Sequence, residues 1–283
     1  MSLEARLQRR IQRYGWDLAA DAYEGLWQGQ LSPAHQRLLQ LAPPTAGERV
    51  LDVACGTGLI ALAAAEQVGE AGQVTGVDIS GRMVAVAERR AEALGLANTR
   101  FARMEGECLD CEDASFDLLY CALGLMYMPE WDHALRQMHR VLRPGGRIAL
   151  AVWGERGRCG WSAVFPIVDA EVRSDVCPLF FQLGHPGMLA ALCRAAGFVD
   201  LHEQRISAPL YYETAGQACE AAFVGGPVAM AWSRFDATTR ARVRARYTEA
   251  IAPWREGRGY RVPGEFVVLV ARKRVGWRGR LHA

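Results

Sequence analysis

The residues best suited to do chemistry lie where a run of apolar residues meets a glycine-rich turn. Val50–Ala54 has the pattern of a buried strand, and Gly56 and Gly58 follow it just before a helical pattern over Leu59–Val68. Glycine lets the backbone bend sharply and lets a ligand approach closer than a Cβ would allow. Asp78 ends the next strand pattern, where its carboxylate can accept hydrogen bonds from two vicinal ribose hydroxyls. This arrangement predicts a site for an adenine-nucleoside cofactor.

Asp52 distinguishes between two cofactors that use such a turn. The spacing Gly56-x-Gly58-x-x-Ala61 also fits the dinucleotide fingerprint, which is a weak signal when it stands alone. A pyrophosphate prefers backbone N–H groups with no carboxylate nearby. A cofactor with an ammonium and a sulfonium group instead gains a charge-assisted hydrogen bond from a nearby carboxylate. Asp52 therefore favours S-adenosylmethionine over NAD.

The elements that must position these residues alternate between strand and helix. Further strand patterns lie at 73–77, 99–103, 116–122, 147–152, 199–207 and 264–272, with helix patterns at 59–68, 82–94, 131–142 and 188–196. A turn at Pro144-Gly145-Gly146 precedes the fifth strand. Alternation with continuous apolar strands predicts an α/β fold whose sheet is mostly parallel and covered by helices on both faces. We predict a seven-stranded, doubly wound, Rossmann-like sheet.

Two segments outside this alternation are predicted to be mostly helical. Residues 1–47 carry amphipathic patterns, the first with an apolar face of Leu7, Ile11, Tyr14 and Leu18. Ser32-Pro33 predicts the start of a separate helix that ends at Leu41. Residues 208–262 form a helical insertion before the last strand. The predicted core is therefore 48–207 together with 263–274.

Four motifs, in the same order, resemble those of the class I S-adenosylmethionine-dependent methyltransferases. Asp52-Val53-Ala54-Cys55-Gly56-Thr57-Gly58 resembles motif I, and Val74-Thr75-Gly76-Val77-Asp78-Ile79-Ser80 resembles the acidic motif that follows it. Met104-Glu105-Gly106-Glu107-Cys108-Leu109 lies where the family often has Gly-Asp-Ala-Glu-x-Leu. Arg140-Val141-Leu142-Arg143-Pro144-Gly145-Gly146 matches the late turn before strand five. The resemblance covers about residues 48–153 and is nearest to the UbiE-like, small-molecule branch.

The resemblance implies which residues contact the cofactor. Asp52 and the glycine turn would hold the methionine part, Asp78 the ribose, and Ile79 the adenine. Glu105 stands where the family usually has Asp, which displaces its carboxylate by one methylene. The N-terminal helices would form a lid, with two tyrosines closing the pocket. The implied cofactor-binding residues are Tyr14, Tyr23, Asp52, Ala54, Gly56, Thr57, Gly58, Asp78, Ile79, Met83, Glu105, Gly106, Glu107, Cys121, Ala122 and Leu123.

The resemblance also implies the reaction, which is methyl transfer to a small acceptor by in-line displacement at the sulfonium methyl. Tyr127 lies where related enzymes often place a polar residue or a histidine, and it is the candidate catalytic residue for positioning the acceptor or handling a proton. Aromatic residues such as Trp153, Trp161 and Phe180 fit a flat or hydrophobic acceptor. They do not choose between O-, N- and C-methylation. No metal is predicted.

Composition excludes some classes of protein. The 283 residues contain 33 basic and 31 acidic side chains, and this net charge of +2 is too small to predict nucleic-acid binding. No apolar run reaches the roughly 18 residues of a membrane span. We expect a cytoplasmic monomer or homodimer with a small-molecule acceptor and no nucleic-acid or membrane partner. The alternatives are an NAD-dependent oxidoreductase and a catalytically silent cofactor-binding protein.

Overall fold

The structure, a computed structural model, describes residues 3–172 and 180–275. Its main sheet has seven strands in the order β3-β2-β1-β4-β5-β10-β6. The first five run parallel, and β10 pairs antiparallel with both β5 and β6. The predicted seven-stranded, mostly parallel sheet is confirmed. The strands are β1 (Arg49–Val53), β2 (Gln73–Asp78), β3 (Thr99–Arg103), β4 (Phe116–Ala122), β5 (Leu142–Trp153), β6 (Phe198–Ser207) and β10 (Glu265–Lys273).

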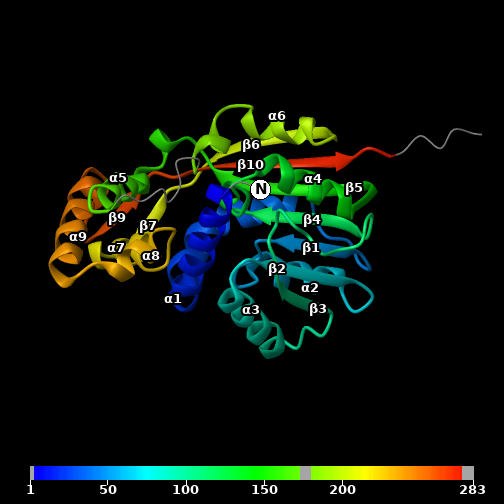
Figure 1. Cartoon of the computed structure of the whole chain (residues 1–283), viewed down its shortest axis with the longest axis horizontal. Helices are drawn as coiled ribbons and strands as arrows, with labels where there is room; N and C mark the ends of the chain where they lie inside the picture. Colours follow the sequence, from blue (N-terminus) through cyan, green and yellow to red (C-terminus); the bar gives the residue numbers. More distant parts are fainter. Residues whose placement is uncertain (1–2, 173–179, 276–283) are drawn as a thin grey trace, which may run out of the picture.

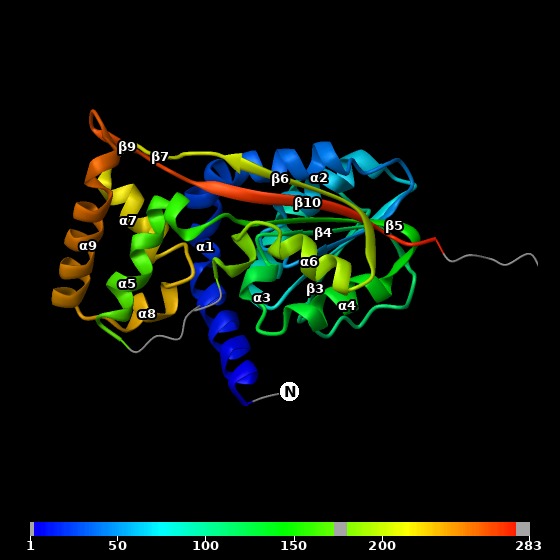
Figure 2. The ribbon, with the colours of Figure 1, turned by 90° about the horizontal axis from the view of Figure 1, so that it is seen from above.

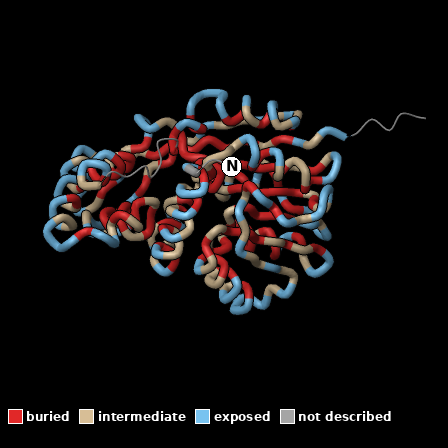
Figure 3. Tube along the Cα trace, in the orientation of Figure 1, coloured by how far each residue is buried: buried red, intermediate tan, exposed pale blue. Residues whose placement is uncertain are grey.

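Helices cover the sheet on both sides, as predicted. Helix α2 (Leu59–Val68) lies with the end of α1 (Leu3–Leu41) on one face, and α4 (Trp131–Val141) and α6 (Met188–Ala195) lie on the other (Figure 2). Helix α3 (Gly81–Ala93) follows β2. Buried residues run through the central strands, while the outer turns of the helices are exposed (Figure 3). Among the described residues, no helix is both long enough and apolar enough to cross a membrane.

Helix α1 corrects the predicted break at Ser32. It is one helix of 39 residues that continues through Pro33. Ser32 accepts a hydrogen bond from the Gln36 side chain (3.0 Å) and does not cap a new helix. Proline costs the helix one N–H donor. Leu31, Ala34 and Leu38 on either side are buried in the core, and this packing holds the helix together across the proline.

The start of β5 corrects a second detail. The segment Pro144-Gly145-Gly146, predicted as a turn before the strand, lies within β5, which already begins at Leu142. The pairing with β4 shifts register between Phe116 and Leu118, so the extra residues are accommodated as an irregularity in the strand.

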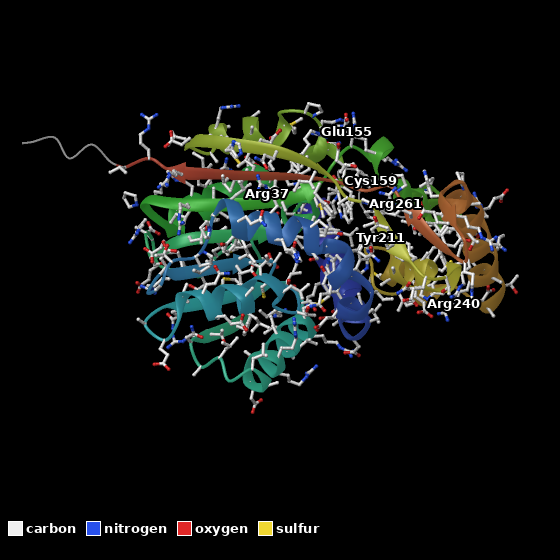
Figure 4. The ribbon with its side chains drawn as sticks, turned by 180° about the vertical axis from the view of Figure 1, so that it is seen from behind. Arg37, Glu155, Cys159, Tyr211, Arg240 and Arg261 are labelled. Carbon is white, nitrogen blue, oxygen red and sulfur yellow. The ribbon has the colours of Figure 1, made fainter. Side chains whose placement is uncertain are left out.

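The insertion at 208–262 is not purely helical. It contains α7 (Ala215–Phe223), α8 (Ala229–Arg234) and α9 (Ala237–Ile251), as predicted, but also a three-stranded sheet in the order β7-β9-β8. These strands are short, which explains why the sequence did not reveal them: β7 (Leu210–Tyr212), β8 (Arg255–Glu256) and β9 (Gly259–Val262). The insertion lies beyond the ends of the parallel strands (Figure 1). Arg261 on β9 donates to the Tyr211 hydroxyl on β7 (3.1 Å; Figure 4).

Short helical segments complete the chain near the insertion. Helix α5 (Val164–Asp169) follows β5, and the 3-10 turns follow β4, follow β5 or precede β8. The 3-10 turns are η1 (Leu125–Tyr127), η2 (Arg156–Arg158), η3 (Gly160–Ala163), η4 (Gln182–Gly184) and η5 (Ala252–Trp254). Helix α1 is joined to the insertion by Gln30, whose side chain exchanges two hydrogen bonds with the Tyr211 backbone (2.5 and 2.9 Å).

Tyr120 links the sheet to the end of α1. Its side chain is fully buried in β4, and its hydroxyl donates to the backbone carbonyl of Ala42. We predict that Tyr120→Phe lowers the free energy of unfolding by about 1–3 kcal/mol, because the buried carbonyl loses its partner. Urea denaturation measures this loss. Tyr14→Phe, at an exposed position, is the control and should change stability little; equal effects would contradict the assignment.

Candidate active site

A cavity of about 100 Å³ lies at the carboxyl ends of β1, β2, β4 and β5. Its walls are formed by the sheet, by α1, and by Gly226 and Pro227 in the loop that precedes α8. The carboxyl edge of a parallel sheet is where ligands bind in such folds. Twelve of the predicted site residues line it: Tyr23, Ala54, Gly56, Asp78, Ile79, Met83, Glu105, Gly106, Glu107, Ala122, Leu123 and Tyr127.

The glycine turn after β1 has the backbone that the sequence predicted. Gly56 and Gly58 have φ angles of 53° and 86°, in the left-handed region that favours glycine. Asp78 accepts hydrogen bonds from the backbone N–H groups of Gly56 and Ser80, both at 2.9 Å. It therefore fastens the turn to the end of β2. Burial raises the pKa of Asp78 to about 6, although these hydrogen bonds oppose the shift.

Asp52 is buried beneath this turn, and it is 1% exposed. Among the described residues, neither of its carboxylate oxygens has a hydrogen-bond partner in good geometry. Burial raises the pKa of Asp52 well above its usual range; the Ala61 backbone N–H opposes this shift, and the nearby Asp78 adds to it. A buried carboxylate without compensation is costly. A cationic group bound at the turn would supply that compensation, so the site fits the ammonium of S-adenosylmethionine.

Tyr23 of α1 covers the two carboxylates. A Cβ placed on Gly56 would lie 3.9 Å from the Tyr23 ring. Burial raises the pKa of the Tyr23 hydroxyl, and the charges of Asp78 and Asp52 raise it further. The ring packs edge-on against Trp16, with centroids 5.7 Å apart. Helix α1 thus closes the cofactor end of the cavity with an aromatic pair.

Strained backbone marks the meeting of the two strand ends. Ala54 and Leu123, at the ends of β1 and β4, both have a φ of 59° and both line the cavity. Positive φ in residues other than glycine costs energy and is frequent at functional sites. A Cβ on Gly124 would lie 2.3 Å from the Ala54 Cβ, so glycine is required for these loops to approach.

Arg9 of α1 is a residue that sequence reasoning missed. Its guanidinium donates to both oxygens of Glu107 (2.7 and 3.0 Å) and to Glu130 (2.6 Å), and it lies 3.7 Å from Glu105. Glu107 also accepts the Glu130 backbone N–H (2.9 Å). Glu107 was predicted to bind the cofactor, but its carboxylate is buried and paired with Arg9. No local pattern could show this, because Arg9 and Glu107 are 98 residues apart.

Several predicted residues do not face the cavity. Tyr14 is on the outer side of α1 and is 42% exposed, whereas Trp16 of the same helix lines the cavity. Asp52, Thr57, Gly58 and Cys121 are buried and are not among the residues that line the cavity. The prediction that Tyr14 closes the pocket does not match this placement. Two side chains that are two positions apart on a helix point to nearly opposite faces, so Tyr14 and Trp16 cannot both face the cavity.

Aromatic side chains form the end of the cavity away from the carboxylates. Trp27, Trp153 and Trp161 lie with ring centroids 4.9–6.2 Å apart. Tyr127 packs between Trp16 and Phe180, each at 5.1 Å. The Trp161 Nε1 is buried without a hydrogen bond. The cavity therefore has a polar end at the glycine turn and an apolar aromatic end, with Tyr127 lining the same space.

The geometry agrees with comparisons to known proteins. Residues 50–146 match the model of a methyltransferase domain. Demethylmenaquinone methyltransferase of Geobacillus kaustophilus is 42% identical over 173 residues, which is 55% of this chain and 72% of that protein. Aklanonic acid methyltransferase DauC of Streptomyces is 35% identical over 134 residues, 47% of this chain and 61% of that protein. The chain thus spans less than two thirds of DauC.

Solved structures share the fold at low sequence identity. YcgJ of Bacillus subtilis has a TM-score of 0.63 at 20% identity, covering 87% of this chain and all of that one. Phosphoethanolamine N-methyltransferase 2 of Haemonchus contortus, solved with S-adenosyl-L-methionine, has a TM-score of 0.58 at 19% identity, covering 91% and 57%. The chain belongs to the S-adenosylmethionine-dependent methyltransferases. S-adenosylmethionine is its cofactor.

Arg9 offers a test of how α1 is held over the site. Because Arg9→Met leaves the buried Glu107 without its cation, we predict a loss of about 3–5 kcal/mol in the free energy of unfolding. Urea denaturation measures it. Arg136→Met removes an exposed pair with Asp132 and should cost less than about 1 kcal/mol. The double variant R9M/E107L should recover part of the loss; a loss no larger than that of R136M would contradict a buried ion pair.

Proposed function

We propose that this chain transfers the methyl group of S-adenosylmethionine to a small, flat or hydrophobic acceptor by in-line displacement. The observation that carries the proposal is the unpartnered Asp52 carboxylate beneath a glycine turn. That turn opens on the same cavity as the aromatic end. When bound, the cofactor supplies a methyl carbon activated by the adjacent sulfonium. The protein's task is then to align the acceptor with that carbon and to exclude water.

The cofactor end assigns separate roles to its side chains. Asp52 would hold the cationic amino-acid tail through a charge-assisted hydrogen bond. Asp78 keeps a free lone pair on each oxygen after its two backbone bonds, and these would accept the ribose hydroxyls. Ile79 and Met83 line the cavity as apolar contacts for the adenine. Glu105 lines it too, with a half-exposed carboxylate that would reach the adenine amino group.

The acceptor end suits an aromatic molecule. The ring centroids of three indoles lie 4.9–6.2 Å from one another, and Tyr127 packs against Trp16 at 5.1 Å. These rings favour stacking and edge-on contacts with a flat acceptor. The buried N–H of Trp161 would bind an oxygen or nitrogen of the acceptor. Two relatives are named for aklanonic acid and demethylmenaquinone, and we propose an organic acceptor of comparable kind. The enzyme would act in the cytoplasm, as a monomer or homodimer, without nucleic acid.

Cofactor binding tests this proposal directly. Isothermal titration should show that S-adenosylhomocysteine binds and that NAD does not. Because Asp52→Asn removes a charge-assisted hydrogen bond worth about 1.5–3 kcal/mol, its affinity for S-adenosylhomocysteine should fall about 10- to 150-fold. Asp110→Asn, an exposed carboxylate, is the matched control and should bind normally. Unchanged affinity in D52N, or tight binding of NAD, would overturn the proposal.

Tyr127 is the proposed catalytic residue. It lines the cavity between Trp16 and Phe180, so its hydroxyl can orient an acceptor or, once deprotonated, take a proton from it. Tyr127→Phe keeps both ring contacts, and we predict a fall in kcat of about 10²-fold or more with an unchanged affinity for S-adenosylhomocysteine. Labelled cofactor and a panel of phenols and quinones provide the assay. A kcat equal to that of the wild type would show that Tyr127 lines the cavity without a catalytic role.

A further inference from the structure

The start of α1 exposes an apolar stripe. Leu7, Tyr14 and Leu18 are 55%, 42% and 49% exposed. Spacings of seven and eleven residues place them on one face of the helix, with Ile11 between them. The opposite face carries Arg9 and Ala20, which are buried against the protein. Figure 2 shows these first turns of α1 projecting from the body of the molecule. The stripe thus has no covering among the described residues.

A row of arginines lies beside the stripe. Arg6, Arg10 and Arg13 line a surface basin together with Tyr14 of α1 and Arg103 of β3. The guanidinium groups of Arg10 and Arg13 lie 5.8 and 5.5 Å from the centre of the Tyr14 ring. Glu105, the carboxylate in the basin wall, lies against Arg9 at 3.7 Å. The basin therefore carries a positive charge, although the chain as a whole is close to neutral.

The basin adjoins the rim of the cavity. The two share Arg9, Ile79, Met104 and Glu105 as lining residues. A surface that held the stripe and the arginines would therefore lie beside the mouth of the cavity. An apolar acceptor dissolved in that surface would then reach the cavity over a short path.

We propose that this face of α1 lies on an anionic lipid surface. Leu7, Tyr14 and Leu18 would enter the boundary between headgroups and acyl chains, and the arginines would contact lipid phosphates. A helix with an apolar stripe beside a basic row is the pattern of interfacial helices. The expectation of no membrane partner rested on the lack of a spanning segment, which a helix lying on the surface does not need. The inference does not depend on which acceptor is methylated.

A lipid surface accounts for the stripe better than a second protein does. A stable protein interface buries about 800 Å² on each partner, with a well-packed apolar centre. Three side chains in a single line offer much less than that. A bilayer needs no complementary shape, and its anionic headgroups match the arginine row. A second copy of this chain is the alternative that the experiment must separate.

Vesicle binding by the full chain tests the proposal. Sedimentation with phosphatidylcholine vesicles, with and without phosphatidylglycerol, should show binding only to the anionic vesicles and a decrease with added salt. Leu7→Ser with Leu18→Ser, and separately Arg6→Gln with Arg10→Gln, should each weaken binding at least about tenfold. The matched controls are L94S/M188S and R89Q/R234Q, which change exposed side chains elsewhere and should bind like the wild type. Inorganic phosphate should not compete.

Three outcomes would overturn the proposal: equal binding to neutral and anionic vesicles, an equal loss in the control variants, or a wild-type dimer that L7S/L18S converts to a monomer. Light scattering measures that oligomeric state. Each variant is also titrated with S-adenosylhomocysteine, which should bind with unchanged affinity because none of the substituted residues lines the cavity. If the wild type itself does not bind S-adenosylhomocysteine, that result counts against the methyltransferase proposal alone, whatever the vesicles show.

Discussion

The fold buries the Asp52 carboxylate without a well-formed hydrogen bond to any described residue, and the rest of the site is arranged around that charge. The glycine turn passes over it, and Tyr23 of α1 covers both it and Asp78. Asp78 accepts two backbone N–H hydrogen bonds that offset part of the cost of its burial, whereas no such pair of bonds is formed by Asp52. A ligand with an ammonium group would remove this deficit. A diphosphate would worsen it, because like charges would then share a site with little water.

The acceptor end depends on the same geometry. Leu123 and Ala54, held at positive φ where β4 and β1 end, bring the two strand ends close together. The cavity therefore passes from Gly56 and Asp78 to Tyr127 and the three indoles. Helix α1 serves both ends, since Tyr23 covers the carboxylates and Trp27 joins the aromatic group. Its position is fixed by the buried Arg9–Glu107 pair and by the bonds of Gln30 to β7.

The sequence predicted the parts of the molecule that rest on local patterns. Buried strands with continuous apolar residues, and glycines that a turn requires, identified the sheet, the turn, Asp52 and Asp78. The pairing of Arg9 with Glu107 joins distant segments, so no local pattern contains it. Tyr14 and Trp16 are two positions apart on one helix, and apolar residues on both sides of that helix hid which side faces the sheet. Pro33 favours a helix start, but the burial of Leu31 and Leu38 outweighs that preference. Strands of two to four residues, such as β8 and β9, carry too little pattern to detect.

The ionisation of Asp52 tests the central claim most directly. Carbon-13 NMR of the labelled aspartate carboxyls, with D52N to assign the signal, can be followed through a pH titration with and without S-adenosylhomocysteine. In the free protein the pKa of Asp52 should lie well above the usual range for aspartate, because burial disfavours the charge. In the complex it should fall markedly, because the ligand ammonium stabilises the carboxylate. A pKa that is ordinary in the free protein, or unmoved by the ligand, would contradict the account.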